Sequence, residues 1–454
     1  MITVKSQRYH FIGVKGAGMS ALATILSKLG HIVKGSDVEF YVFTEDELHA
    51  NHVDVLPFDK NNVRDQELVV VSNAFKDDHI EVIECIEKGI PFSRYHHFLG
   101  ELMKPYSSVA VTGTHGKTTT TALIVHLMGH YKPIVGLIGD GTGVVTGSIQ
   151  ETFVFESCEY RRHFLAYSPE IAVITNIDYD HPDYFHSLSD VVTAFQEMSK
   201  TVRGKIIVCG DDRNIQALSF GIPVTTFGIG NGHDVSAMNV QTFPEGMSFD
   251  VYSKGTYLGR LQIPLYGVHN VLNALAAISV CLEKEVPFQI ISDRIASFKG
   301  AKRRFSKKCI QDRVIIDDYA HHPTAVRSTI YAAKGKYPNR KIVAIFEPHT
   351  YKRLAEFMHQ FAESLSYADH VYVCPLSRFG KAKQQIKHEF TVSDLAALIP
   401  GGKTITEQET VELLNHGNAV FLFMGVGNIT SYKNALENLI YSQEGRVCIP
   451  STPQ

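Results

Sequence analysis

The chain has 454 residues, of which 44% are hydrophobic and 20% charged, and its net charge is −3 at pH 7. This length predicts about three domains, each large enough to build its own core. A pI of about 6.7 and the absence of a basic stripe argue against nucleic acid or an anionic membrane as a partner.

The cysteines indicate a reducing compartment. There are seven of them, an odd number, and no two form a Cys-x-x-Cys pair, which favours free thiols over a disulfide framework. The first ten residues are polar and nowhere do 18 apolar residues run together. We therefore expect neither a signal peptide nor a transmembrane helix, and a cytoplasmic location.

The first segment begins with a strand, a glycine-rich turn, a helix to about Leu29 and a second strand that ends at Asp37. The turn has its glycines at Gly13, Gly16 and Gly18, so it departs from the dinucleotide fingerprint G-x-G-x-x-G. Asp37, however, lies about 20 residues further on, where an NAD-binding acid would sit. An NAD-dependent oxidoreductase therefore stays open as an alternative.

A third strand is predicted over residues 67–74 and a helix over 79–88, before a loosely patterned connection at 99–105. Strand ends in open α/β sheets face the ligand crevice. Small polar residues at these ends are candidates for binding a sugar or a diphosphate, with helix capping as the alternative: Ser36, Asp37, Ser72 and Asn73.

The central segment opens with a motif typical of a phosphate-binding loop. A short β-branched strand over 109–111 is followed by Gly113, Gly116, Lys117 and a run of threonines that starts a helix. Such a turn directs backbone N–H groups and a positive helix end at an anion. Lys117 would reach nucleotide phosphates and the Thr118 hydroxyl would hold Mg²⁺. The spacing G-x-x-G-K-T is shorter than the usual loop.

Strands and helices alternate through the rest of the chain, which indicates parallel sheets. Further strands are predicted over 152–156, 171–176, 205–209, 224–228, 314–319, 341–348, 370–375 and 419–425. A hairpin is expected around Ser253-Lys-Gly-Thr, then a long helix from about Asn270 to Glu285. The tail beyond Glu444 is short and polar and is expected to be mobile.

We therefore predict an α/β protein of three domains: a Rossmann-like domain (1–105), a central phosphate-loop ATPase domain with a parallel sheet (106–304), and a C-terminal Rossmann-like domain (305–454).

Acidic and basic clusters follow several predicted strands. Glu156 and Glu159 follow one strand, and Asp178, Asp180, His181 and Asp183 follow the next. Oxygen-rich groups near a triphosphate suit Mg²⁺, and His181 would complete a second metal shell; a solvated acidic loop is the alternative.

The last domain contributes Asp317-Asp-Tyr-Ala-His-His-Pro323, in which a residue before Pro323 would otherwise serve as a helix cap. Arg303 and Arg304 lie at the boundary between the central and last domains, where a guanidinium group would bind two oxygens of a phosphate.

Taken together, these motifs resemble the Mur ligase family of peptidoglycan synthesis. The resemblance covers Gly13 to Gly427 and rests on Gly113-Thr-His-Gly-Lys-Thr-Thr-Thr, Thr175-Asn-Ile-Asp-Tyr-Asp-His, Tyr266-Gly-Val-His-Asn-Val-Leu-Asn-Ala, Lys302-Arg-Arg-Phe, Asp317-Asp-Tyr-Ala-His-His-Pro and Phe346-Glu-Pro-His-Thr-Tyr-Lys-Arg. It implies an ATP- and Mg²⁺-dependent ligase that joins L-alanine to the carboxylate of UDP-N-acetylmuramate through an acyl phosphate. It also implies a role in cell-wall biogenesis, cell shape and division, and a monomer or weak homodimer.

The resemblance implies a role for each matching residue. The ATP site would comprise Gly113, Thr114, His115, Gly116, Lys117, Thr118, Thr119, Asn270 and Asn273. The metal ligands would be Thr118, Glu159 and His181, and the catalytic residues Lys117, His322, Arg303 and Arg304. The amino-acid pocket would comprise Tyr319, His322, His349 and Arg353. The UDP-sugar would be held by Lys15, Gly16, Ala17, Gly18, Met19, Ser20, Ser36, Asp37, Ser72 and Asn73.

The chain departs from the family pattern at one place. Where the family usually has Glu-Ala-Asp-Glu-Ser-Asp, this chain has Glu156-Ser-Cys-Glu-Tyr-Arg-Arg, so Cys158 replaces an acid and two arginines follow. We expect Glu159 as the metal ligand, with Glu156 as second choice. Two further alternatives stay open: a recycling ligase that attaches a tripeptide to the same sugar, and a nucleotide-switched binding protein.

Overall fold

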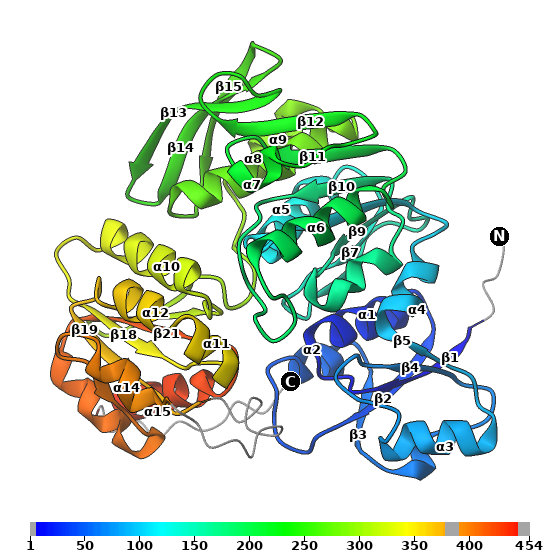
Figure 1. Ribbon diagram of the computed structural model, residues 1–454, viewed down its shortest axis with the longest axis horizontal. Helices are drawn as coiled ribbons and strands as arrows, with labels where there is room; N and C mark the ends of the chain where they lie inside the picture. Colours follow the sequence, from blue (N-terminus) through cyan, green and yellow to red (C-terminus); the bar gives the residue numbers. More distant parts are fainter. Residues whose placement is uncertain (1–5, 377–389, 444–454) are drawn as a thin grey trace.

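The computed structural model describes residues 6–376 and 390–443. The chain forms three lobes, each built on its own sheet, and the N-terminal and C-terminal lobes both lie against the central one (Figure 1). The predicted three-part α/β fold is confirmed. The tail beyond Glu444 lies outside the described residues. Within those residues, no helix is long and apolar enough to cross a membrane.

The N-terminal lobe has a five-stranded parallel sheet in the order β3-β2-β1-β4-β5. Its strands are β1 (Arg8–Ile12), β2 (Ile32–Asp37), β3 (Asp54–Pro57), β4 (Leu68–Val71) and β5 (Phe92–Arg94). Its helices are α1 (Ala17–Lys28), α2 (Glu45–Ala50), η1 (Lys60–Asn62), α3 (Ile80–Lys88) and α4 (Tyr95–Leu102). Having the first strand in the middle is typical of a doubly wound, Rossmann-like sheet. The predicted connection at 99–105 is wrong over its first residues, because α4 continues to Leu102.

The central lobe has a ten-stranded sheet in the order β15-β14-β13-β12-β11-β10-β6-β9-β7-β8. Its strands are β6 (Ser107–Thr112), β7 (Ile134–Leu137), β8 (Gly143–Val145), β9 (Thr152–Glu156), β10 (Ile171–Ile174), β11 (Lys205–Cys209), β12 (Val224–Ile229), β13 (Val235–Phe243), β14 (Gly246–Ser253) and β15 (Thr256–Ile263). Its helices are α5 (Lys117–Met128), η2 (Tyr160–Ala166), α6 (Leu188–Ser199), α7 (Arg213–Gln216), α8 (Val268–Glu283) and α9 (Phe288–Ile295). Neighbouring strands are parallel from β7 to β13, and β8, β14 and β15 add antiparallel edges.

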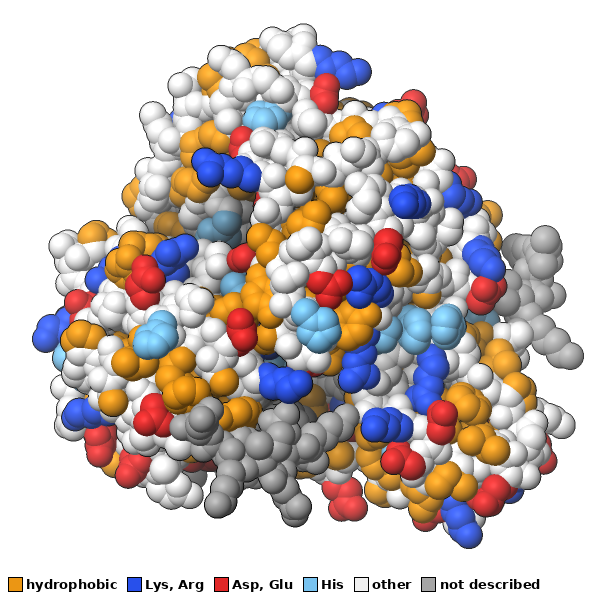
Figure 2. All heavy atoms as spheres, in the orientation of Figure 1, with side chains coloured by type: hydrophobic (Ala, Val, Ile, Leu, Met, Phe, Trp, Pro, Cys, Tyr) orange, Lys and Arg blue, Asp and Glu red, His pale blue; other side chains and the backbone are white. Residues whose placement is uncertain are grey.

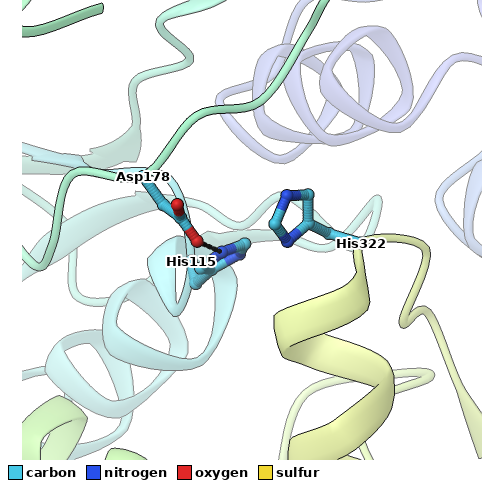
Figure 3. A group of neighbouring side chains, drawn as sticks. All are labelled: His115, Asp178 and His322. Carbon is cyan, nitrogen blue, oxygen red and sulfur yellow. Dashed lines mark hydrogen bonds and ion pairs between the residues drawn. The ribbon is translucent and has the colours of Figure 1, made fainter. Parts of the chain in front are cut away.

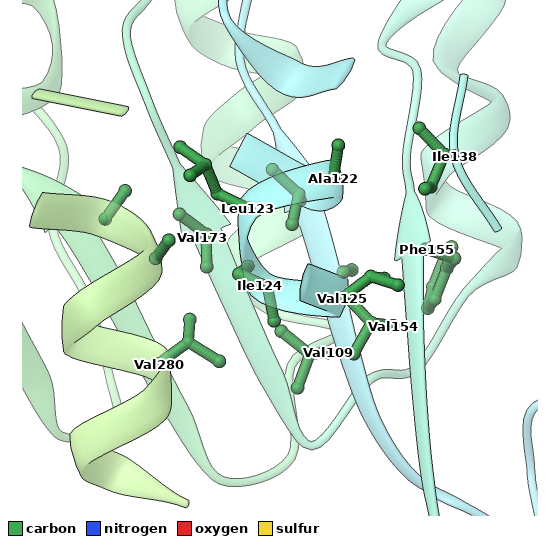
Figure 4. Close-up of a cluster of buried hydrophobic side chains, with 14 of the residues drawn as sticks. Val109, Ala122, Leu123, Ile124, Val125, Ile138, Val154, Phe155, Val173 and Val280 are labelled. Atoms are coloured by element: carbon green, nitrogen blue, oxygen red, sulfur yellow. The ribbon is translucent and has the colours of Figure 1, made fainter. Parts of the chain in front are cut away.

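Helix α5, which follows the phosphate-binding loop, is buried on all sides (Figure 4). Leu123 and Ile124 lie among Val109 of β6, Val173 of β10 and Val280 of α8. Ten of its twelve residues are buried, and each large apolar side chain among them contributes about 1.5–3 kcal/mol. The start of this helix is therefore held in a fixed position relative to the ends of β6 and β10.

The C-terminal lobe has a six-stranded sheet in the order β16-β17-β21-β18-β19-β20, in which only β16 is antiparallel to its neighbour. Its strands are β16 (Ser306–Ile310), β17 (Arg313–Asp318), β18 (Ile342–Phe346), β19 (His370–Val373), β20 (Lys403–Thr404) and β21 (Val420–Met424). Its helices are α10 (Pro323–Lys336), α11 (Tyr351–Glu356), α12 (Met358–Leu365), α14 (Val392–Ala397), η3 (Glu407–His416) and α15 (Ile429–Gln443). The first turns of α10 and α11 follow the carboxyl ends of β17 and β18, which puts the predicted amino-acid residues at one edge of this sheet.

Candidate active site

The turn from β6 to α5 requires glycine at two positions. Gly113 has φ 128°, and a Cβ there would lie 2.1 Å from Thr175 Oγ1 at the end of β10. Gly116 has φ 83°, and its Cβ would lie 2.3 Å from Asn273 Oδ1 on α8. Both positions combine a left-handed backbone with close approach of a neighbour, conditions that other residues do not tolerate. The short loop therefore fits tightly between β10 and α8.

Lys117 provides a cation beside this loop. Its Nζ donates to Glu159 Oε2 at 2.9 Å and to the Thr114 carbonyl at 3.1 Å. Burial by itself lowers the pKa of Lys117, but the carboxylate of Glu159 raises that pKa above its ordinary value. The ammonium group therefore stays charged at the N-terminus of α5, where a phosphate would bind.

Glu156 and Glu159, the two glutamates of the segment that differs from the family pattern, have different hydrogen-bond and ion-pair partners. Glu156 Oε2 accepts a 2.7 Å hydrogen bond from Thr118 Oγ1. Glu159, whose side chain is 2% exposed, lies with Oε1 3.7 Å from His181 Nε2. Burial lowers the pKa of His181, so its imidazole is neutral and offers a lone pair. A hydroxyl, two carboxylates and an imidazole converge on the loop, and this donor set fits Mg²⁺.

The C-terminal lobe meets the phosphate-binding loop at His115, Asp178 and His322 (Figure 3). His115 Nε2 lies 3.2 Å from Asp178 Oδ2, and Thr324 Oγ1 donates to the same oxygen at 3.1 Å. Burial alone raises the pKa of Asp178, but its hydrogen bond with His115 and the electrostatic interaction with that ring lower it to about 2. Asp178 is therefore a carboxylate that connects the loop to α10.

His322 caps α10, as the alternative interpretation of this motif expected. Its Nδ1 accepts from the Thr324 N–H at 3.3 Å, and its Nε2 lies 3.1 Å from the Tyr179 carbonyl oxygen, to which the neutral ring donates. Burial, with His115 nearby, lowers its pKa to about 4. Both ring nitrogens are in use, so this arrangement positions α10 and leaves no free lone pair for a general base.

Arg353 and Asp180 form a buried ion pair between the lobes. Arg353 Nε and Nη2 donate to Asp180 Oδ1 at 3.0 and 2.6 Å, and His349 Nδ1 lies 3.3 Å from Nη1. Burial by itself raises the pKa of Asp180, but Arg353 holds it well below the usual range. Burial and the neighbouring guanidinium lower the pKa of His349 to about 4. The pair fixes α11 against the end of β10.

The two candidate arginines point to different places. Arg303 is 7% exposed; its guanidinium donates to Asp317 Oδ1 at 3.2 Å and to the carbonyls of Gly425 and Val426. Arg304 instead reaches the central lobe, where Nη2 donates to Thr118 Oγ1 at 3.0 Å. The structure therefore brings Arg304 to the phosphate-binding loop and ties Arg303 to the C-terminal lobe.

Asn270 and Asn273 lie on the first turns of α8, beside the loop. Asn273 Nδ2 donates to Asn270 Oδ1 at 3.1 Å, and Asn270 Nδ2 donates to the Tyr266 carbonyl at 2.8 Å. Lys336 of α10 lies 4.2 Å from the centre of the Tyr266 ring. This end of the site is thus also closed by a side chain of the C-terminal lobe.

A cavity of about 1030 Å³ between the central and C-terminal lobes unites most of the predicted residues. Figure 2 shows the surface hollowed between these two lobes. The predicted residues that line the cavity are Thr114, His115, Gly116, Lys117, Thr118, Thr119, His181, Asn270, Asn273, Arg304, Tyr319, His322, His349 and Arg353. Gly113, Glu159 and Arg303 are not among the residues that line it.

The predicted UDP-sugar residues lie outside this cavity, in the N-terminal lobe. Lys15 Nζ donates to the carbonyls of Val38 and Phe40 and pairs with Glu45, while Asp37 accepts from the Lys15 N–H at 2.7 Å. Gly16, Ala17, Gly18, Met19 and Ser20 form the turn into α1 and its first residues. Both carboxylate oxygens of Asp37 therefore accept a backbone N–H of this lobe, from Lys15 and from Val38.

The other polar candidates of this lobe have different surroundings. Ser36 is buried and donates to Glu81 Oε2 at 2.5 Å. Ser72 accepts from the Ala74 N–H. Asn73 lies between two rings, since Oδ1 is 2.8 Å from His96 Nδ1 and Nδ2 is 3.3 Å from His163 Nδ1. Only Asn73 among the three therefore lies where the N-terminal lobe meets the central lobe.

Some lining residues had no signal in the sequence. Thr324 and Lys336 are ordinary helix residues that come to the cavity only because α10 faces the central lobe. His269 lies in the motif at 266–274, but its proximity to the phosphate-binding loop depends on α8 packing against α5. Such residues can be identified only when the packing of helices and lobes against one another is known.

A phosphate-binding loop with converging carboxylates and cations from a second lobe defines a nucleotide-dependent enzyme. Three family descriptions match the chain: "Mur ligase family, catalytic domain" over residues 8–107, "Mur ligase middle domain" over 111–281, and "Mur ligase, glutamate ligase domain" over 303–427. The chain belongs to the Mur ligase family, and it is thus an ATP-dependent ligase of peptidoglycan synthesis.

Solved structures of this family resemble the chain over most of its length. The UDP-N-acetylmuramate-alanine ligase of Thermotoga maritima is 27% identical, with a TM-score of 0.79, covering 97% of this chain and 100% of that one. A murein peptide ligase of Psychrobacter arcticus is 22% identical, with a TM-score of 0.74 and coverage of 98% and 100%, and shares the fold. The UDP-N-acetylmuramate:L-alanyl-gamma-D-glutamyl-meso-diaminopimelate ligase of Neisseria meningitides is 28% identical, with a TM-score of 0.57 and coverage of 66% and 100%.

Proposed function

We propose that this protein joins L-alanine to the carboxylate of UDP-N-acetylmuramate at the expense of ATP. The observation that carries the proposal is the cavity itself, which collects the phosphate-binding loop, a metal-binding donor set and the cations of the last lobe. A carboxylate is a poor acyl donor until it is phosphorylated, so this chemistry needs cations around a phosphate.

The reaction has two balanced steps. The muramyl carboxylate oxygen attacks the γ-phosphorus and ADP leaves, which gives an acyl phosphate. The alanine nitrogen then attacks the acyl carbon, phosphate leaves, and the nitrogen loses its proton. Mg²⁺ would neutralise phosphate charge, and Thr118, Glu159 and His181 would hold it, with Glu156 beside Thr118.

The chain's own residues have assigned parts in this proposal. Lys117 would leave Glu159 to bind the β- and γ-phosphates, and Arg304, already on Thr118, would stabilise the charge of the transferred group. Asn270 and Asn273 would contact adenine. Tyr319, His349 and Arg353 would line the amino-acid pocket, with His322 fixing the helix beside it.

The N-terminal lobe would bind the UDP-sugar. Lys15 to Ser20, Ser36, Asp37, Ser72 and Asn73 remain the proposed residues, of which Asn73 lies at the junction with the central lobe. We propose domain boundaries near residues 105 and 304, between the three sheets. The six free cysteines of the described residues support a reducing, cytoplasmic compartment. A monomer or weak homodimer stays a prediction.

L-alanine is preferred over a tripeptide because the structure of the alanine ligase resembles the chain with a TM-score of 0.79, against 0.74 and 0.57 for the structures from Psychrobacter and Neisseria. The Phe346-Glu-Pro-His-Thr-Tyr-Lys-Arg stretch also looks like the alanine enzyme. The second candidate is the tripeptide ligase, which the 28% identity to the enzyme from Neisseria favours.

Phosphate release with ATP, Mg²⁺ and UDP-N-acetylmuramate tests the choice. L-alanine should support turnover more strongly than L-serine, glycine or the L-alanyl-γ-D-glutamyl-meso-diaminopimelate tripeptide. Turnover with the tripeptide and none with L-alanine would select the second candidate. Lys117→Ala should abolish release with every acceptor, and undiminished release would refute the role of the loop.

A further inference from the structure

Cys158 brings a thiol to the proposed metal ligands. Its side chain is half-buried and lines the cavity. The sulfur of Cys158, a carboxylate oxygen of Glu159 and a ring nitrogen of His181 all lie within 4.8 Å of one another. The trio therefore combines a soft sulfur ligand with one oxygen and one nitrogen ligand.

The other two ligands of this trio are prepared for a cation. Glu159 is almost fully buried and already holds the ammonium group of Lys117 at 2.9 Å. The centre of the His181 ring lies 4.6 Å from that of Tyr160, whose hydroxyl donates to Asp183 Oδ2 at 2.6 Å. The Tyr160 ring thus packs against the imidazole and helps to hold it in place.

Arg162 anchors the segment that carries the thiol. Arg162 donates to Asp190 and Glu197 of α6 and to the Tyr184 hydroxyl, at distances of 2.7 to 3.1 Å. These three bonds anchor η2, which begins two residues after Cys158. Ligands on rigidly held segments lose little conformational entropy when a metal binds.

We propose that Cys158, Glu159 and His181 form a site for a thiophilic divalent ion, with Zn²⁺ as the ion that fits best. Three protein ligands of types S, O and N, with solvent as the fourth, match the open tetrahedral sites of this metal. When the sulfur–zinc bond forms, the thiol proton passes to solvent and Lys117 gives up Glu159. Thiolate and imidazole favour zinc over magnesium, so Zn²⁺ would take two of the groups proposed for Mg²⁺.

A titration of the full chain with Co²⁺, a spectroscopic substitute for zinc, tests the site directly. We expect one equivalent to produce a thiolate-to-cobalt charge-transfer band that Zn²⁺ removes and a large excess of Mg²⁺ does not. The band should be absent from Cys158→Ser. It should be present in the control variant Cys309→Ser, which removes an exposed thiol on β16. No band in the unsubstituted protein, or a band that survives Cys158→Ser, would overturn the proposal.

A second variant keeps the test independent of any loss of folding. Cys158→Asp restores the acid of the family pattern, so it should weaken Zn²⁺ binding at least tenfold in competition with a chromophoric chelator while thermal unfolding without metal is unchanged. Equal zinc affinity in both proteins would contradict a role for the thiol. The titrations contain no nucleotide or substrate, so their outcome does not depend on which ligase reaction the protein catalyses.

Discussion

Two adjacent arginines have opposite surroundings, and their substitution should have opposite effects. Arg304→Ala removes the donor that reaches Thr118 Oγ1, so we expect kcat to fall at least tenfold with the melting temperature nearly unchanged. Arg303→Ala leaves the buried carboxylate of Asp317 and two carbonyls without this partner, which should destabilise the lobe by about 3 kcal/mol. Phosphate-release kinetics and thermal unfolding of both variants measure the difference. An equal loss of stability in both variants would refute the assignment of Arg304 to the active site and of Arg303 to the stability of the C-terminal lobe.

Gly116 is predicted to be irreplaceable even by alanine. A Cβ would lie 2.3 Å from Asn273 Oδ1 at a left-handed φ of 83°, so Gly116→Ala should cost about 1–3 kcal/mol and abolish ATP binding. Gly335→Ala is the matched control, because Gly335 is an exposed residue in the last turn of α10 where a Cβ would meet nothing within 4 Å, and alanine should stabilise that helix by up to about 1 kcal/mol. Calorimetric ATP titration and thermal unfolding report both effects, and normal ATP affinity in Gly116→Ala would contradict the packing argument.

The cap of α10 makes the stability of this element depend on pH. The pKa of His322 is about 4 in the folded protein and about 6.5 in an unfolded chain. Between these values the unfolded chain binds more protons, so the free energy of unfolding falls as pH drops from 6.5 to 4, by at most about 1.4 kcal/mol per pH unit for this histidine.

The variant His322→Asn separates capping from protonation, because asparagine caps helices well and does not titrate. Its melting temperature should be close to that of the unsubstituted protein at pH 7.5 and should fall less on acidification to pH 4.5. His130→Asn, which changes an exposed histidine, is the control and should keep the full pH dependence. Identical pH dependence in His322→Asn would show that His322 does not contribute.

The elements that sequence patterns predicted are those with a strong period or a clear turn. The buried strands around the phosphate-binding loop and the hairpin at 253–256 are confirmed, and Lys254 and Gly255 both have the positive φ of the expected turn. Strands such as β3 and β13 were missed. β3 has four residues and ends in Pro57, and the outer half of β13 is largely exposed and polar, so their pairing depends on a neighbouring strand rather than on their own pattern.

The site residues that could be predicted from the sequence are those that belong to one continuous motif or follow neighbouring parallel strands. The loop from Gly113 to Thr118 and the acids after β9 and β10 lie side by side because parallel strands end at one edge. The sequence left Arg303 and Arg304 equivalent, and left open whether His322 acts as a base or as a cap. Those choices depend on side-chain direction across a lobe boundary, which no local pattern contains.

At the scale of the whole molecule, three consecutive residues after β10 hold the last lobe on the central one. Asp178 accepts from Thr324, the Tyr179 carbonyl contacts His322, and Asp180 pairs with Arg353. The same segment leads directly into His181, a proposed metal ligand. We therefore expect closure of the lobes and assembly of the metal site to be linked, as in enzymes whose site is completed by a conformational step.

Breaking the Asp180–Arg353 pair should open the molecule. Asp180→Asn leaves a buried guanidinium without its counter-charge, which costs about 3–5 kcal/mol and weakens the contact between the two lobes. We expect a larger radius of gyration in small-angle X-ray scattering and a lower kcat. Lys205→Met, which removes a partly exposed pair with Glu283, should change neither, because such pairs contribute at most about 1 kcal/mol.

Arg353→Lys sharpens this experiment, because it keeps the charge and loses the two-nitrogen fork on Asp180 Oδ1. A larger radius of gyration in both variants would show that the contact between the lobes depends on the geometry of the Asp180–Arg353 pair. A larger radius only in Asp180→Asn would show that it depends on charge alone. If scattering from Asp180→Asn matched that of the unsubstituted protein, the remaining contacts of Asp178 and Tyr179 would suffice for closure, and the buried pair would have no role in joining the lobes.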